Sequence, residues 1–576
     1  MNTPFIPENA PFSNDQRLWL GGFFAGLHSR KLAAADQGGA AVKSVTILYG
    51  TQTGNSESLC HDIAAMAGAH GMAAEVVDMA QFTVEQLAET ERVLIVTSTY
   101  GEGEHPDNAL TLWKAMTADN APKLDKTFFS VLGLGDTSYD LFCQAAIEWD
   151  AQLQLLGATR VQDRVDCDVD FEEPAEEWAQ AALAAITVVG SQEGAVTGGA
   201  AAAPAKEKSK YNKKNPFLAK LLKKRTLNKE GSSKEVLHYE ISLEGSDIDY
   251  KIGDALCVYP TNCAAYASDL IAALGLDPNT EVEGGTLHSV FVAHYEIRTP
   301  SKELIQDVAS KTGNSEFKDA AADKKVIGDW LWGRETIDVI TENDVKYTAE
   351  EFLALSKKLQ ARAYSISSSP KKHEGEVHLT VGSVRYESHG RSRKGVASCF
   401  LADIVEENKT DVGVYLHANK AFTTPADFDA PMIMVGPGTG IAPFRSFLEE
   451  REMTEAKGKN WLLFGDRNSA TDYLYEDELE EMKASGLLTK LSLAFSRDQE
   501  EKIYVQTKMV EHGAELFQWL EEGGYFFVCG DAFRMAKDVD KALHQVIATH
   551  GNLSEDQAAE YVQKLQSEKR YVRDVY

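Results

Sequence analysis

The sequence has little positive charge, few cysteines and no apolar run long enough to cross a bilayer. Among its 576 residues, 58 lysines and arginines face 88 aspartates and glutamates, which gives a formal net charge of −30. Such a chain repels the phosphate backbone of nucleic acids, so we expect no nucleic-acid partner. The most apolar candidate, residues 18–27, is far shorter than a membrane helix and contains three glycines. We therefore expect a cytoplasmic protein that does not enter a membrane.

The seven cysteines are spread singly along the chain. No pair has the C-x-x-C spacing that is typical of zinc sites and redox motifs. The sequence therefore predicts reduced thiols, with neither a disulfide framework nor a metal site.

The length of the chain and its strand pattern predict several domains. Residues 45–49, 92–99 and 128–134 are short strand-like runs, each followed by a small polar loop. Alternation of such runs with helical segments is typical of a parallel, doubly wound α/β sheet, which binds ligands beyond the carboxyl ends of its strands. The same alternation returns after residue 431, in the runs MIMVG, WLLFG and YFFVCG.

A flexible linker and a β-rich domain are predicted between these two α/β parts. Residues 188–210 are rich in glycine and alanine and cannot form much core. Residues 211–430 have strand-rich ends and a helical pattern at about 264–358, which favours an antiparallel β-barrel with a helical insertion. The predicted parts are an N-terminal extension (1–43), a first α/β domain (44–187), the linker (188–210), the barrel domain (211–430) and a second α/β domain (431–576).

Charge is distributed unevenly along the chain. Residues 41–190 contain 24 acidic and 7 basic side chains, whereas residues 206–225 contain nine basic and one acidic. Both segments are compatible with ordinary solvated surfaces. The alternative is that opposite charge steers a mobile acidic domain onto basic docking faces.

A candidate phosphate-binding loop follows the first predicted strand. In residues 51–56 (TQTGNS), hydroxyl groups, backbone N–H groups and the start of a helix together form a cradle for phosphate. The loop lacks the lysine of nucleoside-triphosphate loops, so a monophosphate is the better ligand. An ordinary capped turn is the alternative.

Two later loops bring aromatic side chains to the same edge of the predicted sheet. Residues 98–103 follow the second strand and residues 134–139 follow the third, and they contain Tyr100 and Tyr139. Two aromatic rings there suit a planar isoalloxazine ring, because stacking is favourable and excludes water. Half-buried surface tyrosines are the alternative.

These three loops resemble those of flavodoxin and of the FMN domain of diflavin reductases. The resemblance implies a flavodoxin-like domain that binds FMN, with the phosphate at residues 51–56 and the ring between Tyr100 and Tyr139. The implied FMN residues are Thr51, Gln52, Thr53, Gly54, Asn55, Ser56, Ser98, Thr99, Tyr100, Gly101, Leu134, Gly135, Asp136, Thr137, Ser138, Tyr139, Asp140, Leu141, Phe142 and Cys143.

Segments of the barrel domain imply a second flavin. Residues 362–368 (RAYSISS) resemble the R-x-Y-S motif of the ferredoxin–NADP⁺ reductase family. In that motif Arg362 offers a fork of donors to a pyrophosphate, and Tyr364 offers an aromatic face to FAD. Ala363 stands where the family usually has a larger residue. The implied FAD residues are Thr299, Arg362, Ala363, Tyr364, Ser365, Thr380, Val381, Gly382, Tyr386, Gly395, Val396, Ala397, Ser398 and Tyr576.

A glycine-rich loop opens the last domain, which resembles the NADP-binding domain of the same family. The glycines of residues 436–445 (GPGTGIAPFR) let the backbone approach a pyrophosphate closely. Downstream, Arg497 and Lys502 suit a ribose 2′-phosphate, which favours NADPH over NADH. A solvated charged loop is the alternative. The expected NADP residues are Gly438, Thr439, Ser496, Arg497, Lys502, Ile503, Tyr504, Val505, Gln506 and Asp538.

The resemblance also implies where hydride transfer occurs. It places Cys529, Ser365 and Asp574 beside the nicotinamide, where they orient the ring and stabilise charge and do not act as nucleophiles. Tyr576, the last residue, matches the terminal aromatic residue that stacks on the FAD ring until the nicotinamide displaces it. The expected enzyme is an NADPH oxidoreductase that passes electrons from NADPH through FAD and FMN to a separate acceptor.

Within the diflavin reductases, the chain resembles the flavoprotein subunits of assimilatory NADPH–sulfite reductases. The tail RYVRDVY and the stretches GKNWLLFGDRN and VCGDAFRMAKDVD carry this resemblance. It implies a siroheme and iron–sulfur hemoprotein partner, reduction of sulfite to sulfide and a role in cysteine biosynthesis. The main alternative is a general reductase for a P450, a heme oxygenase or a flavodoxin-type acceptor. A flavin-binding redox sensor is a further alternative.

One further segment departs from the pattern of these subunits, and another one resembles it. The Asn-Phe-Arg that is usual in these subunits reads Lys420-Ala421-Phe422-Thr423, which calls into question any contact of that arginine with FAD or NADPH. Residues 16–28 are apolar and aromatic and resemble the N-terminal region of those subunits. We expect residues 16–28 to mediate homo-oligomer or partner contact, with an ordinary packing helix as the alternative.

Overall fold

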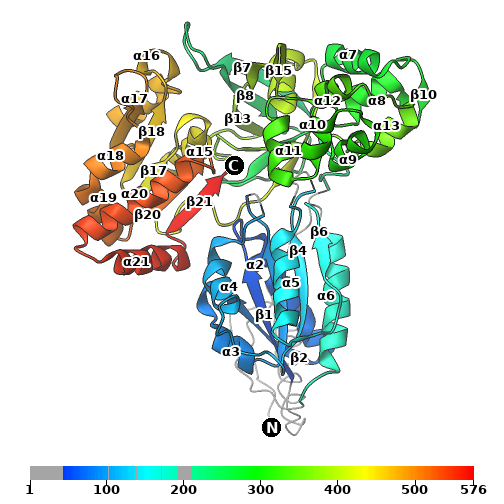
Figure 1. Cartoon of the computed structure of the whole chain (residues 1–576). Helices are drawn as coiled ribbons and strands as arrows, with labels where there is room; N and C mark the ends of the chain where they lie inside the picture. The colour runs from blue at the N-terminus through cyan, green and yellow to red at the C-terminus, as the bar shows by residue number, and fades with distance from the viewer. Residues whose placement is uncertain (1–42, 102, 138–140, 170, 192–209) are drawn as a thin grey trace, which may run out of the picture.

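The computed structural model describes residues 43–101, 103–137, 141–169, 171–191 and 210–576 (Figure 1). Three large β-sheets organise this part of the chain, and each is packed with its own helices. The predicted contact segment at residues 16–28 and most of the predicted linker lie outside the described residues. The architecture confirms the predicted order of a parallel, an antiparallel and a second parallel sheet.

The first sheet is parallel and follows the order β2-β1-β3-β4-β5, with β6 beside β4. Its central strands are apolar because helices cover both faces, α2 and α6 on one and α3 to α5 on the other. This order places the loops after β1, β3 and β4 at one edge. The elements are β1 (Lys43–Gly50), α2 (Asn55–Ala67), β2 (Met72–Asp78), α3 (Val84–Glu89), β3 (Arg92–Ser98), α4 (Leu110–Met116), β4 (Phe128–Leu134), α5 (Gln144–Leu155), β5 (Thr159–Arg160), β6 (Val165–Cys167) and α6 (Glu172–Thr187).

The second sheet is antiparallel and follows the order β12-β9-β16-β7-β8-β13. Its two ends meet, because Ile366 just after β12 forms an antiparallel bridge with Leu379 of β13. The sheet therefore curls into the expected barrel around one apolar core. The elements are β7 (Phe217–Thr226), β8 (Val236–Ser242), β9 (Ala255–Val258), β12 (Arg362–Ser365), β13 (Glu376–Gly382), the hairpin β14 (Arg385–Ser388) and β15 (Arg391–Lys394), α14 (Val396–Cys399) and β16 (Asp411–His417).

A helical insertion separates β9 from β12, as the pattern at about 264–358 predicts. Its helices share a core of their own, in which Phe291, Phe317 and Phe352 are fully buried. The elements are α7 (Ala264–Leu274), β10 (Glu281–Val282), β11 (Gly285–Thr286), α8 (Leu287–Ala293), α9 (Lys302–Lys311), α10 (Ser315–Ala321), α11 (Lys324–Leu331), α12 (Thr336–Asn343) and α13 (Ala349–Leu355).

The third sheet is parallel and follows the order β19-β18-β17-β20-β21. Helices again cover both of its faces, so the strands MIMV, WLLFG and YFFVCG are almost fully buried. The elements are β17 (Met432–Val435), α15 (Ala442–Met453), β18 (Asn460–Asp466), α16 (Ser469–Asp472), α17 (Glu476–Ala484), β19 (Lys490–Phe495), α18 (Val505–Glu511), α19 (Gly513–Glu521), β20 (Tyr525–Gly530), α20 (Met535–His550), α21 (Glu555–Ser567) and β21 (Tyr571–Val575).

The three parts meet at the end of the chain (Figure 1). Arg573 of β21 forms an ion pair with Asp107 of the first part, with Nε 3.1 Å from Oδ2. Lys569, just before β21, pairs with Glu57 of α2 at 2.8 Å. These contacts hold the edge of the first sheet that carries the three loops against the third sheet, so the described arrangement is closed.

A buried charged network joins the helical insertion to the hairpin of the barrel. Arg393 of β15 binds Glu335 at 3.0 Å and Asp338 at 2.6 Å, both at the start of α12. Glu335 also binds Arg298 at 2.7 Å. All four side chains are more than nine-tenths buried. Since β15 leads directly into residues 395–398, this network orients that segment.

Replacing Arg393 tests whether the network holds the insertion in place. We expect Arg393→Met to lower the free energy of unfolding by about 3 kcal/mol, because it removes the buried guanidinium that Glu335 and Asp338 share. The matched control is Arg391→Met, whose guanidinium also binds Asp338 but is 43% exposed, and which should cost less than about 1 kcal/mol. Urea denaturation measures the free energy of unfolding of both variants. An equal decrease in the two variants would contradict the prediction.

Candidate functional site

The loop after β1 has the geometry of an anion cradle. Gly54 is the N-cap residue of α2 and adopts a φ of 82°, which favours glycine. Its N–H donates to Thr51 Oγ1 at 2.9 Å, which closes the loop. The Ser56 hydroxyl at the start of the helix is fully buried and has no hydrogen-bond partner among the described residues. An unpaired hydroxyl at a helix N-terminus fits a bound phosphate group.

The other two loops of the first sheet lie beside this cradle. The Thr99 N–H donates to the Leu134 carbonyl at 2.9 Å, which ties the loop after β3 to the end of β4. The Thr137 hydroxyl donates to Asp168 at 2.7 Å. Tyr100 is half-buried, and burial raises the pKa of its phenol well above the usual range. Its predicted stacking partner Tyr139 lies outside the described residues, together with Ser138 and Asp140.

A cavity of about 970 Å³ separates these loops from the barrel. The first part contributes Gly101, Thr137 and Leu141 to its walls. The barrel and its helical insertion contribute six of the predicted FAD residues. These are Thr299, Arg362, Tyr386, Gly395, Val396 and Ala397.

Basic side chains that the sequence motifs missed surround the same cavity. Five of them are spread over the helical insertion and one comes from β15, so no short pattern links them in the sequence. Their positive charge suits the pyrophosphate of a dinucleotide flavin. They are Arg298, Lys302, Arg334, Lys357, Lys358 and Lys394.

Other predicted FAD residues turn their side chains elsewhere. The Thr380 hydroxyl lies 2.6 Å from the Tyr475 hydroxyl in the interior, and Val381 is part of the barrel core. The Ser398 hydroxyl accepts a hydrogen bond from the Val384 N–H at 3.2 Å, and Tyr364 packs against the barrel core. These positions therefore shape the site through the backbone and the packing of the barrel.

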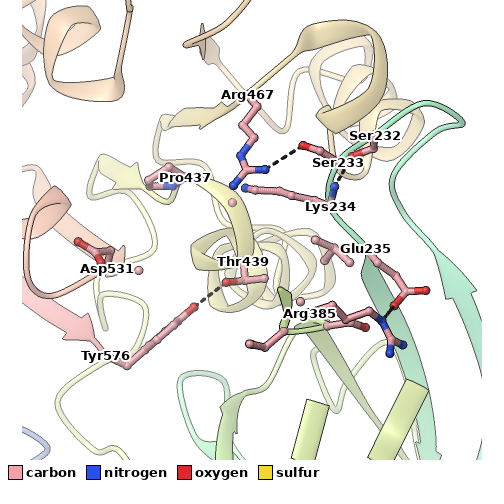
Figure 2. A pocket seen from close by; sticks show the side chains of 16 residues that line it. Ser232, Ser233, Lys234, Glu235, Arg385, Pro437, Thr439, Arg467, Asp531 and Tyr576 are labelled. Carbon is pink, nitrogen blue, oxygen red and sulfur yellow. Dashed lines mark hydrogen bonds and ion pairs between the residues drawn. The ribbon is translucent and has the colours of Figure 1, made fainter. Parts of the chain in front are cut away.

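The glycine-rich loop after β17 lines a cavity of about 780 Å³ (Figure 2). Figure 2 shows Tyr576 and Thr439 pointing toward one another across it, with their oxygens 3.0 Å apart. A Cβ at Gly440 would lie 2.2 Å from the Cys529 carbonyl oxygen, so only glycine allows the loop to approach β20 this closely. Lys234 and Arg467, which the motifs missed, add positive charge to the walls.

An adjoining cavity of about 460 Å³ continues from Gly438 toward α18. It brings together Ser496, Tyr504, Val505, Gln506 and Asp538, as the motifs predict. Arg534, which the motifs missed, also lines this cavity. Arg497, Lys502 and Ile503 lie in the loop between β19 and α18, outside the lining of this cavity.

The four predicted catalytic residues gather where β20 and β21 meet the barrel. Asp574 lies opposite Cys529 in the parallel pairing of these strands, and the Ser365 hydroxyl donates to Asp574 Oδ2 at 3.0 Å. The Tyr576 N–H donates to the Gly530 carbonyl at 3.0 Å, while its side chain remains 57% exposed. The cluster thus connects the nucleotide cavity with β12, the barrel strand that carries the R-x-Y-S residues.

Burial controls the charge of this cluster. It raises the pKa of Asp574 to about 6, against the opposing effect of hydrogen bonds from Ser365 and Asn419. Burial also raises the pKa of the Cys529 thiol far above its ordinary value. At neutral pH the site therefore holds one carboxylate and a neutral thiol, which excludes a thiolate nucleophile.

Comparison with known proteins gives each part of the chain a family. Residues 47–178 match the flavodoxin family, residues 209–400 match a FAD binding domain, and residues 434–541 match an oxidoreductase NAD-binding domain. The three domains bind FMN, FAD and NADPH, respectively. Three such domains in one chain define the class of diflavin reductases.

Three curated relatives that align with most of the chain share the name sulfite reductase (NADPH) flavoprotein alpha-component. The relative from Bacillus subtilis is 41% identical, with 100% of this chain and 99% of the relative aligned. The relative from Vibrio parahaemolyticus is 42% identical over 98% of this chain and 93% of the relative. The relative from Neisseria meningitidis is 42% identical over 92% of this chain and 89% of the relative. The chain belongs to the family of sulfite reductase (NADPH) flavoprotein alpha-components.

The raised pKa of Asp574 predicts the pH dependence of NADPH oxidation. The nicotinamide becomes cationic as it loses hydride, and a carboxylate beside it stabilises that charge. Since Asp574 is protonated below about pH 6 and ionised above it, we expect the single-turnover rate of NADPH oxidation to rise through an inflection near pH 6. Asp574→Asn should abolish the inflection and lower the rate at pH 8 by about 10- to 100-fold.

A second variant separates this effect from misfolding. Ser365→Ala removes a hydrogen bond that lowers the pKa of Asp574, so it should move the inflection to higher pH. Stopped-flow absorbance between pH 5 and pH 9 measures both variants. A wild-type rate without any inflection in this range would contradict the assignment.

Proposed function

We propose that this chain is the flavoprotein component of an NADPH-dependent sulfite reductase, and that it delivers electrons to a siroheme and iron–sulfur hemoprotein that reduces sulfite to sulfide. The observation that carries this proposal is the position of β21. Within six residues, Arg573 contacts the flavodoxin-like domain, Asp574 contacts Ser365 of the barrel, and Tyr576 lines the nucleotide cavity. The names of the relatives supply the class of acceptor.

The residues that gather where β20 and β21 meet the barrel have separate roles in this proposal. When bound, FAD supplies the acceptor for hydride from NADPH, and FMN supplies one-electron transfer to the hemoprotein. Tyr576 occupies the end of the nucleotide cavity and must leave it for the nicotinamide to enter. Ser365 holds the carboxylate of Asp574 in place, and that carboxylate stabilises positive charge on the nicotinamide. The neutral, buried Cys529 packs behind this point and excludes water.

The charged and polar residues of each site would select its cofactor. The basic residues around the barrel cavity would hold the pyrophosphate of FAD, and residues 51–56 would hold the FMN phosphate. Ser496, Arg497, Lys502, Tyr504 and Gln506 would bind the ribose 2′-phosphate of NADPH.

The proposal also includes the assembly and the location of the protein. Residues 16–28 would mediate homo-oligomer or hemoprotein contact, and the protein would act in the cytoplasm for cysteine biosynthesis. In the part of the chain that the structure describes, no helix combines the length and the apolar character that a bilayer-spanning segment needs.

Reconstitution with a hemoprotein tests the proposed function. We expect the purified chain to contain about one FMN and one FAD and to support NADPH-dependent sulfide production only with a siroheme hemoprotein. Reduction of a P450, a heme oxygenase or a flavodoxin, with no sulfide production, would favour a general reductase instead.

Deletion of residues 1–40 tests the proposed contact segment. We expect the deletion to lower the mass measured by light scattering, to abolish hemoprotein binding, or to do both. If neither changes, residues 16–28 have no contact role.

Coenzyme selectivity tests the 2′-phosphate site. We expect Arg497→Ala to raise the KM for NADPH about tenfold and to leave kcat and the KM for NADH nearly unchanged, because it removes a contact to the 2′-phosphate alone. The control is Lys508→Ala, whose ammonium pairs with Glu511 at 2.7 Å on α18. Steady-state kinetics with both nucleotides measures the effect, and an equal rise for NADH would place Arg497 outside this role.

A further inference from the structure

The segment that departs from the family pattern lies on the phosphate loop of the FMN domain. The backbone N–H groups of Lys420 and Ala421 donate to the carbonyl oxygen of Thr53 at 2.8 and 3.3 Å. A Cβ at Gly54 would lie 3.1 Å from Lys420 Cβ. The loop between β16 and β17 is therefore in direct contact with residues 51–56, although the two are more than 360 residues apart.

The position of this segment is held by buried neighbours. Phe422 is 1% exposed and packs against Phe444 and Phe527 in the core of the third sheet. The Asn419 N–H donates to Asp254 at 2.9 Å, and the Asn419 side chain accepts from the Phe422 N–H at 3.2 Å. Anchors on both sides present Lys420 and Ala421 to the FMN domain.

The side chain of Lys420 reaches the first turn of α2. Its Nζ donates to Ser58 Oγ at 2.5 Å. Lys569, from the same half of the chain, reaches the neighbouring Glu57 at 2.8 Å. The N-terminus of a helix carries partial positive charge, which attracts anions and repels cations. An ammonium group beside it is stabilised when a phosphate group binds there as well.

A second observation points to the same ligand. The Ser56 hydroxyl, on the same turn of α2, is fully buried and has no hydrogen-bond partner among the described residues. Such a donor is costly to bury unless a ligand accepts from it. The orphan hydroxyl of Ser56 and the contact of Lys420 with Ser58 thus lie on the same first turn of α2, next to the loop at residues 51–56.

We propose that Lys420 binds the FMN phosphate across the domain boundary, so that the closed arrangement holds FMN more tightly than the FMN domain does when it is undocked. This inference rests on the proposed function, since it requires FMN at residues 51–56. The lysine ammonium is a mobile point charge that suits a phosphate dianion. Because coupling between two equilibria is reciprocal, FMN binding stabilises domain closure by the same factor. Riboflavin, which lacks the phosphate, does not have this effect.

Binding of FMN and of riboflavin to the full-length chain without FMN tests this role. Fluorescence titration with each flavin gives its dissociation constant, with FAD left in place. We expect Lys420→Met to raise the dissociation constant of FMN about tenfold, as for loss of a partly exposed charge-assisted contact. The dissociation constant of riboflavin should stay unchanged, since Lys420 contributes only through the phosphate.

Two further variants act as controls. Lys420→Arg keeps the positive charge and should keep FMN affinity close to that of the wild type. Gln563→Ala removes a hydrogen bond between the same two halves, from Gln563 Nε2 to Thr111 Oγ1 at 2.9 Å, away from the phosphate loop. It should weaken FMN binding less than Lys420→Met does and leave riboflavin binding unchanged, because it acts on FMN only by lowering the population of the closed arrangement.

The outcomes separate this inference from the proposed function. Equal weakening of FMN and riboflavin by Lys420→Met would show that Lys420 only docks the domains, and no weakening would exclude any contact with the phosphate. Either result overturns the inference while the proposed function stands. If the wild-type chain itself binds no FMN, the proposed function fails first.

Discussion

The pairing of β21 with β20 is the interaction on which the functional part of the structure depends. β21 is the last element of the chain and the edge strand of the third sheet, in which it pairs with β20. Its side chains are aimed at three different partners, with Arg573 toward the FMN domain, Asp574 toward the barrel and Tyr576 toward the nucleotide cavity. A shift of this strand would alter all three contacts together. Contacts to all three parts of the chain therefore meet at one strand and the residue that follows it.

Charge explains how the FMN domain reaches this strand. Its acidic surface meets basic side chains of the other half of the chain, in the pairs Asp107–Arg573 and Glu57–Lys569. In both pairs the FMN domain supplies the carboxylate and the last part of the chain supplies the cation. Each pair is partly exposed, so its net contribution to stability is small and is weakened by salt. Such contacts suit a domain that must dock near FAD and then leave to meet its acceptor.

A buried ionic network joins the barrel to its helical insertion. The buried network around Arg393 connects the helical insertion to the segment at residues 395–398, and its charges are largely buried. Breaking a buried ionic network costs far more than breaking an exposed pair. The charges of this network are thus more deeply buried than those of the pairs that connect the FMN domain to the rest of the chain. The difference follows from burial and not from the kind of residue, since both sets are arginine–carboxylate or lysine–carboxylate pairs.

The sequence by itself determined the class of fold, because strand periodicity and the glycine-rich loops depend on neighbouring residues. It also indicated the loops at residues 51–56 and 436–445, whose phosphate-binding geometry is local. It did not indicate Lys234, Arg334 or Lys357 as pocket residues, because they are joined to the motifs only through space. Only the tertiary structure placed Lys420 on the FMN loop and gave Asp574 its raised pKa. Both depend on the docking of domains and on burial, which no run of neighbouring residues encodes.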